Sequence, residues 1–321
     1  MEKNAVPAIF HIISTGFVAL LLVNSISCVR KEEPIKPEPA SREAITENNN
    51  IVRKDAIRIA VGGMITPKEG IIYYKAFIDY VGRKVGRPVQ FIDREKYDEI
   101  NTLLKTGDID AAFVCSGPYV DGHDKFGLEL LAAPQTYGSI AYYSYIIVSK
   151  GSPITDFEGL RGKRFAFADP LSNTGALVPT YMLGKMHETP ASFFNQYIYT
   201  YAHDKSIRAV ALKLVDGAAV DSLIWDYLDR TNPEFTSKTR IIKKSPPYGI
   251  PPIAVRKGLD PELKIAMQQA LLNAHKDAEG KELLRKMMID RFVVIPDSAY
   301  DSVRKMKAWI ARQGPGTKQG R

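Results

Sequence analysis

A polar turn between two apolar segments carries the residues best suited to binding chemistry. The octapeptide from Asp169 to Ala176 follows the apolar run 164–168 and precedes a second apolar run that begins at Leu177. A residue before proline favours extended geometry, so Asp169 ends a strand, and the next polar residues, Ser172, Asn173 and Thr174, favour helix N-caps. Unpaired N–H groups at the positive end of a helix dipole would hold a small oxyanion there without a metal. An ordinary helix cap explains the same spacing.

A histidine and a carboxylate follow the next two apolar segments. His203 comes after 197–201, and Asp221 ends the segment 218–221. A histidine at a strand end that faces a helix N-terminus can donate an N–H to an anion in a charge-assisted bond, although His203 could instead cap the helix after it. Asp221 and Trp225 are expected at the mouth of the same unit. The carboxylate could accept a bond from a protonated oxyanion, pair with an amino group, or be a solvated N-cap.

Two tyrosines of the first half of the folded chain complete the candidate set. Tyr119 ends the segment 116–119, which we expect to be a loop after a strand at 111–115. Its ring could bind ligand or pack on the next helix. Tyr142 begins a long strand at 142–148, and the packing around it would help to select the ligand.

Apolar periodicity predicts a β-α-β-α-β unit over the first part of the folded chain. Strands are expected at 57–61, 89–92 and 111–115, with helices at 71–81 and 97–104 between them. Such an order predicts a parallel sheet with helices on both faces and ligand contacts at the carboxyl ends of the strands, including the loop 62–67.

A second alternation of strands and helices begins after residue 148, and the chain then returns to the first unit. Strands at 165–168, 197–201 and 218–221 alternate with helices, and strands at 241–242 and 253–255 bracket the proline-rich segment 246–252. Helices are expected through 263–271, 283–284 and 300–310. We therefore expect two doubly wound α/β domains, joined by crossings near Val148 and Pro246, with a ligand in the cleft between them.

Composition excludes few function classes. A net charge of +8 over 321 residues suits anionic ligands, membranes and nucleic acid alike, but no basic run with interleaved aromatic residues supports nucleic-acid binding. The five histidines lack metal-ligand spacing, and no nucleotide-binding or hydrolase motif occurs, so we expect no metal, no cofactor and no catalysis. Cys28 and Cys115 lie in unlike surroundings and should not pair, with Cys115 a small buried hydrophobe.

The N-terminus has the pattern of an export signal. A basic residue, an apolar stretch and small residues precede Cys28, as at the processing site of bacterial lipoproteins, so we expect residues 1–28 to be a lipoprotein signal with Cys28 lipidated. Residues 29–55 are rich in Pro, Glu, Lys and Asn, and we expect them to form a disordered tether. The expected domains are 56–148 with 247–312, and 149–246, before a disordered tail at 313–321.

Several separate motifs resemble the substrate-binding proteins of phosphate, phosphite and phosphonate ABC transporters. They are DPLSNTG at 169–175, HD at 203–204, VDGAAVDS at 215–222, LRGK at 160–163 and IPPIAVR at 250–256, and the likeness extends over about 57–306. The resemblance implies a type II periplasmic-binding-protein fold that closes on its ligand. It maps the oxyanion site onto Ser172, Asn173, Thr174 and the amides of Gly175 and Ala176, with His203 and Tyr119 as further binding residues.

Two functions share this ligand, and a third does not. The chain is expected to be a monomeric, lipid-anchored component of an importer that presents a phosphorus oxyanion to permease subunits. The same module could instead report to a membrane sensor kinase. An enzyme on this fold is the third hypothesis, and a sulfonate is the alternative ligand.

Overall fold

The computed structural model describes residues 55–62 and 68–313. The expected signal with Cys28, nearly all of the tether, residues 63–67 of the first loop and most of the expected tail lie outside these ranges.

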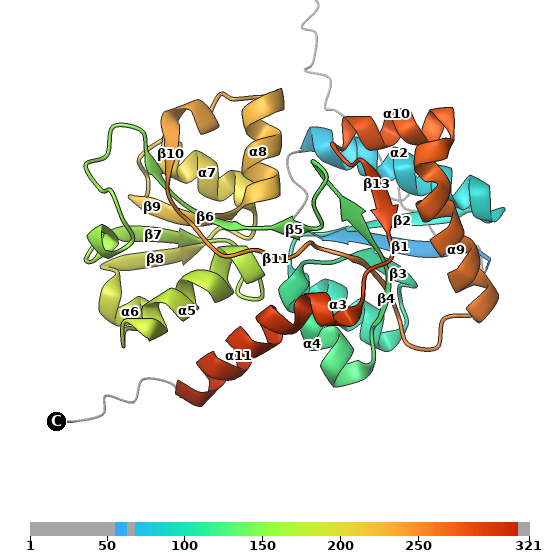
Figure 1. The fold of residues 1–321 in the computed structure, drawn as a ribbon, viewed down its shortest axis with the longest axis horizontal. Coiled ribbons are helices and arrows are strands. Elements are labelled where there is room, and N and C mark those ends of the chain that lie inside the picture. The colour runs from blue at the N-terminus through green and yellow to red at the C-terminus, as the bar shows by residue number, and fades with distance from the viewer. Residues whose placement is uncertain (1–54, 63–67, 314–321) are drawn as a thin grey trace, which may run out of the picture. The chain divides into compact units, whose positions relative to one another are not determined.

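The first lobe is built on a sheet with helices on both faces (Figure 1). Ile59 points to one face, which α2 (Lys68–Val85), α9 (Pro261–Asn273) and α10 (Ala278–Lys286) cover, whereas Ala60 points to the other, covered by α3 (Tyr97–Thr106), α4 (Ser116–Phe126) and α11 (Asp301–Gln313). This alternation follows from the two-residue period of a strand. The six strands, in sheet order, are β13 (Arg291–Val293), β4 (Glu129–Gln135), β12 (Ile253–Val255), β3 (Ala111–Phe113), β1 (Ile57–Gly62) and β2 (Val89–Arg94).

This sheet is mixed, so the expectation of a parallel sheet was only partly right. β1 runs parallel to β2 and β3, as predicted, but β12 is antiparallel to both β3 and β4. β12 belongs to the segment that returns from the second lobe, and it enters the sheet from the opposite end. β13, which the sequence reading missed, adds an antiparallel edge.

The second lobe has its own sheet and its own pair of cores. Aromatic residues such as Phe157, Phe165 and Phe193 fill one face, and Ile147, Ile207 and Val210 fill the other. The strands, in sheet order, are β10 (Thr239–Lys244), β6 (Ser144–Ser149), β9 (Gly217–Asp221), β7 (Arg164–Phe167) and β8 (Gln196–Tyr199), and the α- and π-helices are η2 (Asn173–Leu177), α5 (Val178–Lys185), α6 (Pro190–Phe193), α7 (His203–Ala211) and α8 (Ser222–Thr231). Within the described residues, short 3₁₀ helices lie at Glu158–Leu160, Thr236–Lys238, Ala274–Lys276 and Asp297–Tyr300.

Two short strands pair where the chain passes between the sheets. β5 (Ala141–Tyr142) and β11 (Tyr248–Gly249) are antiparallel, with Tyr142 opposite Tyr248. The long strand expected at 142–148 is therefore divided at Tyr143. Val148 lies inside the second sheet, opposite Gly217, so the chain leaves the first sheet before β6 and not near Val148.

The last helix contacts both lobes. Lys307 of α11 pairs with Asp121 of α4 at 2.7 Å, while the Trp309 ring lies edge-to-face on Tyr181 of α5 at 4.9 Å between centroids. Figure 1 shows α11 running between these two helices. A single rigid element thus spans the two lobes on one side.

Candidate functional site

The polar turn folds as a capped π-helix, η2. Ser172 is its N-cap, and the Ser172 Oγ atom accepts a hydrogen bond from the Gly175 amide at 3.0 Å. The Ala176 amide donates to the Ser172 carbonyl at 3.1 Å. Both amides that were expected to hold an oxyanion are therefore already bonded within the turn. That detail of the prediction was wrong, because the first turn is closed by its own cap.

The side chains of the same turn are left with unsatisfied polar atoms. Asn173 and Thr174 are completely buried, and Asn173 Oδ1 and Thr174 Oγ1 lack a hydrogen-bond partner among the described residues. Leaving a buried polar atom unpaired costs about 1–3 kcal/mol. Rotating the Asn173 amide by 180° would let Tyr142 donate to its oxygen and would present its NH₂ group instead. Thr174 and the rotated Asn173 amide would then offer two buried hydrogen-bond donors on consecutive residues of η2.

His203 supplies a third donor in a defined tautomer. Its Nδ1 accepts from the Asp221 amide at 3.1 Å, so a neutral ring carries its proton on Nε2, and Nε2 is buried without a partner among the described residues. Burial lowers the pKa of His203 to about 3. The N-cap of α7 is Ala202, and no side chain caps it, so the alternative that His203 caps its own helix was wrong. The bond that His203 offers is that of a neutral imidazole.

The closeness of η2 and His203 depends on Gly175. A methyl group at Gly175 would lie 2.9 Å from His203 Cε1 and 2.5 Å from the Ala168 side chain. The absence of a side chain thus brings the imidazole onto the turn. Spacing alone had not indicated this role for Gly175.

Asp221 is an N-cap, as one alternative held, but it is not solvated. Its Oδ1 accepts from the Leu223 amide at 2.8 Å at the start of α8, and the residue is only 1% exposed. Burial raises the pKa of this carboxyl to about 7. Near neutral pH the group can either donate or accept a hydrogen bond.

The first lobe contributes two buried tyrosines, of which the sequence analysis named Tyr142 but not Tyr97. Tyr142 is buried, and its hydroxyl accepts from Asn173 Nδ2 at 3.1 Å and lies 3.7 Å from the Cys115 thiol. Tyr97, at the start of α3, is also buried. Burial raises the pKa of Tyr97 well above its usual value, whereas a hydrogen bond with the Ser172 side chain opposes that rise. A polar residue just after the strand 89–94 is the sequence signal that could have identified Tyr97.

The two lobes meet tightly around these groups. The segment 116–119 is the first turn of α4, not a loop, and Gly117 lies so close to η2 that a methyl group there would be 2.3 Å from the Leu171 carbonyl oxygen. The Tyr97 amide donates to Asp169 Oδ2 at 3.1 Å, and Lys205 of the second lobe pairs with Glu95 of the first. The site is therefore enclosed by backbone and side chains of both lobes.

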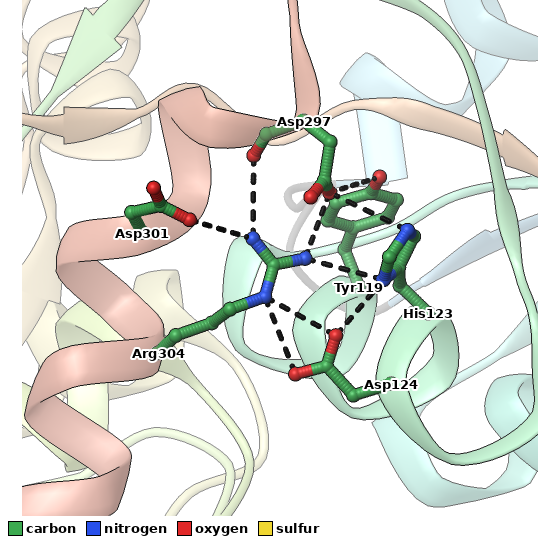
Figure 2. Close-up of polar contacts among 6 residues, drawn as sticks. All are labelled: Tyr119, His123, Asp124, Asp297, Asp301 and Arg304. Carbon is green, nitrogen blue, oxygen red and sulfur yellow. Dashed lines mark hydrogen bonds and ion pairs between the residues drawn. The ribbon is translucent and has the colours of Figure 1, made fainter.

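Two of the expected binding residues lie elsewhere. The Tyr119 hydroxyl donates to Asp297 Oδ1 at 2.8 Å, and Figure 2 shows it within an ionic cluster around Arg304, turned away by its position one helical turn into α4. The Trp225 Nε1–H donates to Thr239 Oγ1 at 3.1 Å, on the face of α8 that packs into the second lobe. Both assignments to the site were wrong for the same reason, since helix phase directs these side chains into other contacts.

The assembled groups are suited to a small oxyanion. The Thr174 hydroxyl and His203 Nε2 are unpaired buried donors, and the Asn173 amide becomes a third if rotated. Asp221, whose amide donates to His203, adds a titratable carboxyl, and none of these groups carries a fixed positive charge. Within the described ranges, no cluster of three or more potential metal ligands occurs. None of the helices in those ranges combines the length and apolar character that a membrane span requires.

Comparisons with known proteins identify the family of the chain. The profile of the family described as "ABC transporter, phosphonate, periplasmic substrate-binding protein" matches residues 64–300. The phosphonates-binding periplasmic protein of Escherichia coli is 27% identical over 249 residues, which are 76% of this chain and 73% of that protein.

Solved structures show the same fold. A binding protein component of an ABC phosphonate transporter from Pseudomonas aeruginosa has a TM-score of 0.77 at 22% identity, covering 83% of this chain and 90% of the other. A protein from Prochlorococcus marinus in complex with methylphosphonate has a TM-score of 0.73 at 18% identity, covering 80% and 99%. The fold is the type II periplasmic-binding-protein fold, and the chain belongs to the family of periplasmic substrate-binding proteins of phosphonate ABC transporters.

Proposed function

We propose that this protein binds a small phosphorus oxyanion (a phosphonate, phosphite or phosphate) between its lobes and presents it to the permease of an ABC importer. It acts without catalysis and as a monomer. The export signal and Cys28 anchor it by a lipid on the outer side of a bacterial membrane, and the tether 29–55 gives the binding lobes reach.

The observation that carries the proposal is the enclosed set of unpaired polar atoms. Thr174 Oγ1, Asn173 Oδ1 and His203 Nε2 are buried without partners in the described part of the chain. Burial of several such atoms is unfavourable unless a bound group satisfies them. With the Asn173 amide rotated so that its NH₂ takes the place of its oxygen, a tetrahedral oxyanion would accept from all three side chains, and a protonated oxygen would donate to Asp221. The methylphosphonate bound by the Prochlorococcus relative is a ligand of this class.

Calorimetry on the whole chain in mild detergent tests the proposal. Phosphate, phosphite, methylphosphonate, aminoethylphosphonate, sulfate and taurine would be titrated into the wild type and Thr174→Val. We expect one phosphorus oxyanion to bind tightly and the variant to lose about 10- to 150-fold in affinity, as for one hydrogen bond to a charged group. Thr155→Val, on the surface of the same lobe, is the matched control. No binding across the panel, or equal binding by Thr174→Val, would refute the site.

The anchor and the output need a cellular test. Cys28→Ser should abolish incorporation of labelled fatty acid and release the protein from the membrane fraction, and Cys115→Ser serves as the control. Ligand-dependent uptake that is lost on deletion would support import. A transcriptional response with no change in uptake would favour the sensor hypothesis.

A further inference from the structure

A mostly apolar cavity lies between the lobes next to the proposed oxyanion site. Its volume is about 80 Å³, and its wall combines residues of both lobes. A group the size of a water molecule needs about 10–15 Å³ of such volume. The cavity therefore has room for several heavy atoms. Its lining includes Tyr74, Phe113 and Ile289 from the first lobe and Leu223, Ile224 and Tyr227 from the second.

The cavity is linked to the proposed site through Leu223. Leu223 lines the cavity, and its own amide is the donor to Asp221 Oδ1 at 2.8 Å. Tyr74 of the first lobe also lines the cavity and lies edge-to-face on Phe113 at 5.2 Å. Leu223 thus connects the wall of the cavity to the carboxyl of Asp221.

Several polar groups of the cavity wall already have partners. Lys286 lies 3.8 Å from Glu282 and over the Tyr73 ring, and the Tyr137 hydroxyl contacts Met288 Sδ at 3.0 Å. The Thr136 amide is bonded to the Ser139 carbonyl. Because most of the remaining wall is aromatic or aliphatic, an occupant would gain mainly by burying apolar surface.

We propose that the ligand is an organophosphonate whose apolar alkyl or aryl substituent fills this cavity while its phosphonate group binds at Thr174 and His203. This inference rests on the proposed function. It gives the cavity one occupant and predicts that a larger apolar substituent is preferred to a methyl group or to the hydroxyl of phosphate. The direction of the substituent follows from the hydrogen bond that links Asp221 to Leu223 on the cavity wall.

A ligand series measures the preference directly. Methyl-, ethyl-, propyl-, butyl- and phenylphosphonate would be titrated calorimetrically into the wild-type protein. We expect affinity to rise about fourfold for each methylene buried, until the cavity is full. Affinity that falls steadily from methyl to propyl would overturn the inference and leave the oxyanion site standing. Phosphate and phosphite would be titrated in parallel: binding of either of these without binding of any phosphonate would overturn the inference, whereas no binding by any of the compounds would contradict the proposed function.

A cavity-filling variant tests the location. Ile224→Trp, on the wall contributed by α8, should reduce the ratio of propyl- to methylphosphonate affinity to near one. Ile265→Trp is the matched control, because Ile265 is 60% exposed on α9, and it should keep the wild-type ratio. Thermal denaturation would verify that both variants fold. A wild-type ratio in a folded Ile224→Trp protein would show that the substituent lies elsewhere.

Discussion

The side chains proposed to donate to the anion are uncharged and buried. His203 can donate from Nε2 because the Asp221 amide occupies Nδ1, and its burial keeps the ring uncharged. A neutral donor suits an anion that arrives with its own charge, since several such dipoles can stabilise it without a buried cation that would need a partner when the ligand is absent.

Removing the His203 donor should weaken anion binding. His203→Asn retains a polar side chain, but the shorter amide cannot both accept from the Asp221 amide and reach the anion. We expect affinity for the preferred oxyanion to fall about 10- to 150-fold, the range for one hydrogen bond to a charged group. His187→Asn is a matched control, because His187 has a positive φ of 59° that asparagine tolerates. Isothermal titration would measure both, and equal affinities would contradict the role.

Asp221 should make stability fall as pH rises. The pKa of its carboxyl is raised from 3.8 to about 7 in the folded protein, so the folded state binds more protons between these values. The penalty is absent below about pH 3.8 and reaches at most about 4 kcal/mol above pH 7. Asp221→Asn keeps the helix cap and should be more stable than wild type in urea at pH 8, with the advantage shrinking towards pH 4.5.

The contribution of His203 to stability has the opposite pH dependence, so the effects of the two residues can be distinguished. Its pKa is lowered from 6.5 to about 3, so its contribution to stability is lost as pH falls through that window. The two effects oppose each other in the wild type, and Asp221→Asn should expose the histidine slope below pH 6.5. Asp156→Asn is the matched control, because Asp156 is an exposed carboxylate that likewise accepts a hydrogen bond from a backbone amide, that of Gly159. If the stability of Asp221→Asn had the same pH dependence as that of the wild type, the raised pKa of Asp221 would be refuted.

The sequence predicted the residues of the turn but not the direction of every side chain. Ser172, Asn173, Thr174, His203, Asp221 and Tyr142 come together, since each lies at the end or start of an element that local patterns predict. Tyr119 and Trp225 do not join them, because their direction depends on helix phase and on partners such as Asp297 and Thr239 that are distant in sequence. Tyr97 was missed because its contact with the site requires the lobes to be together.

At the scale of elements, α4 and η2 abut with no space between their backbones. Gly117 makes that approach possible, and no sequence pattern distinguishes it from a helix-start glycine. Local periodicity predicted β1, β2, α3, β7 and β9 within a few residues. It could not predict that β12 inserts antiparallel between β3 and β4, because the partners of a three-residue strand are chosen by the whole sheet.

Adding one methyl group between α4 and η2 should hold the lobes apart. In Gly117→Ala the new Cβ would meet the Leu171 carbonyl oxygen at 2.3 Å, and backbone cannot yield as a flexible side chain can. Overpacking of this kind costs about 1–3 kcal/mol, so we expect ligand affinity to fall about 5- to 150-fold. With saturating ligand, small-angle scattering should show a larger radius of gyration for Gly117→Ala than for the wild type. Gly151→Ala, which has open space, should behave as wild type.

At the scale of the molecule, α11 joins the two lobes independently of the ligand. Arg304 holds its first half to Asp124 and Asp297, next to α4 (Figure 2), and Trp309 packs its second half on Gly184 and Tyr181 of α5. The chain crossings and this helix therefore provide separate connections. Unfolding of one lobe is expected to be coupled to that of the other.

Trp309→Ala should weaken that coupling. Loss of a partly buried indole is expected to lower the free energy of unfolding by about 2–4 kcal/mol. The chain has two tryptophans, so Trp225 then reports the second lobe alone. In urea, the Trp225 fluorescence transition should separate from the circular-dichroism transition of the whole protein, whereas exposed Lys305→Ala should show coincident transitions. Coincident fluorescence and circular-dichroism transitions in Trp309→Ala would argue against a role for α11 in coupling the unfolding of the two lobes.

The complete burial of Thr174 and His203 also bears on the rate at which a ligand dissociates. Because the backbones of α4 and η2 meet at Gly117 and Leu171, we expect an anion bound at these groups to leave during excursions in which the lobes part. The residence time of the ligand is then the waiting time for opening, whatever the strength of the individual hydrogen bonds. A transporter that accelerates opening would empty the protein faster than dilution does, and a protein locked shut would be a trap rather than a carrier.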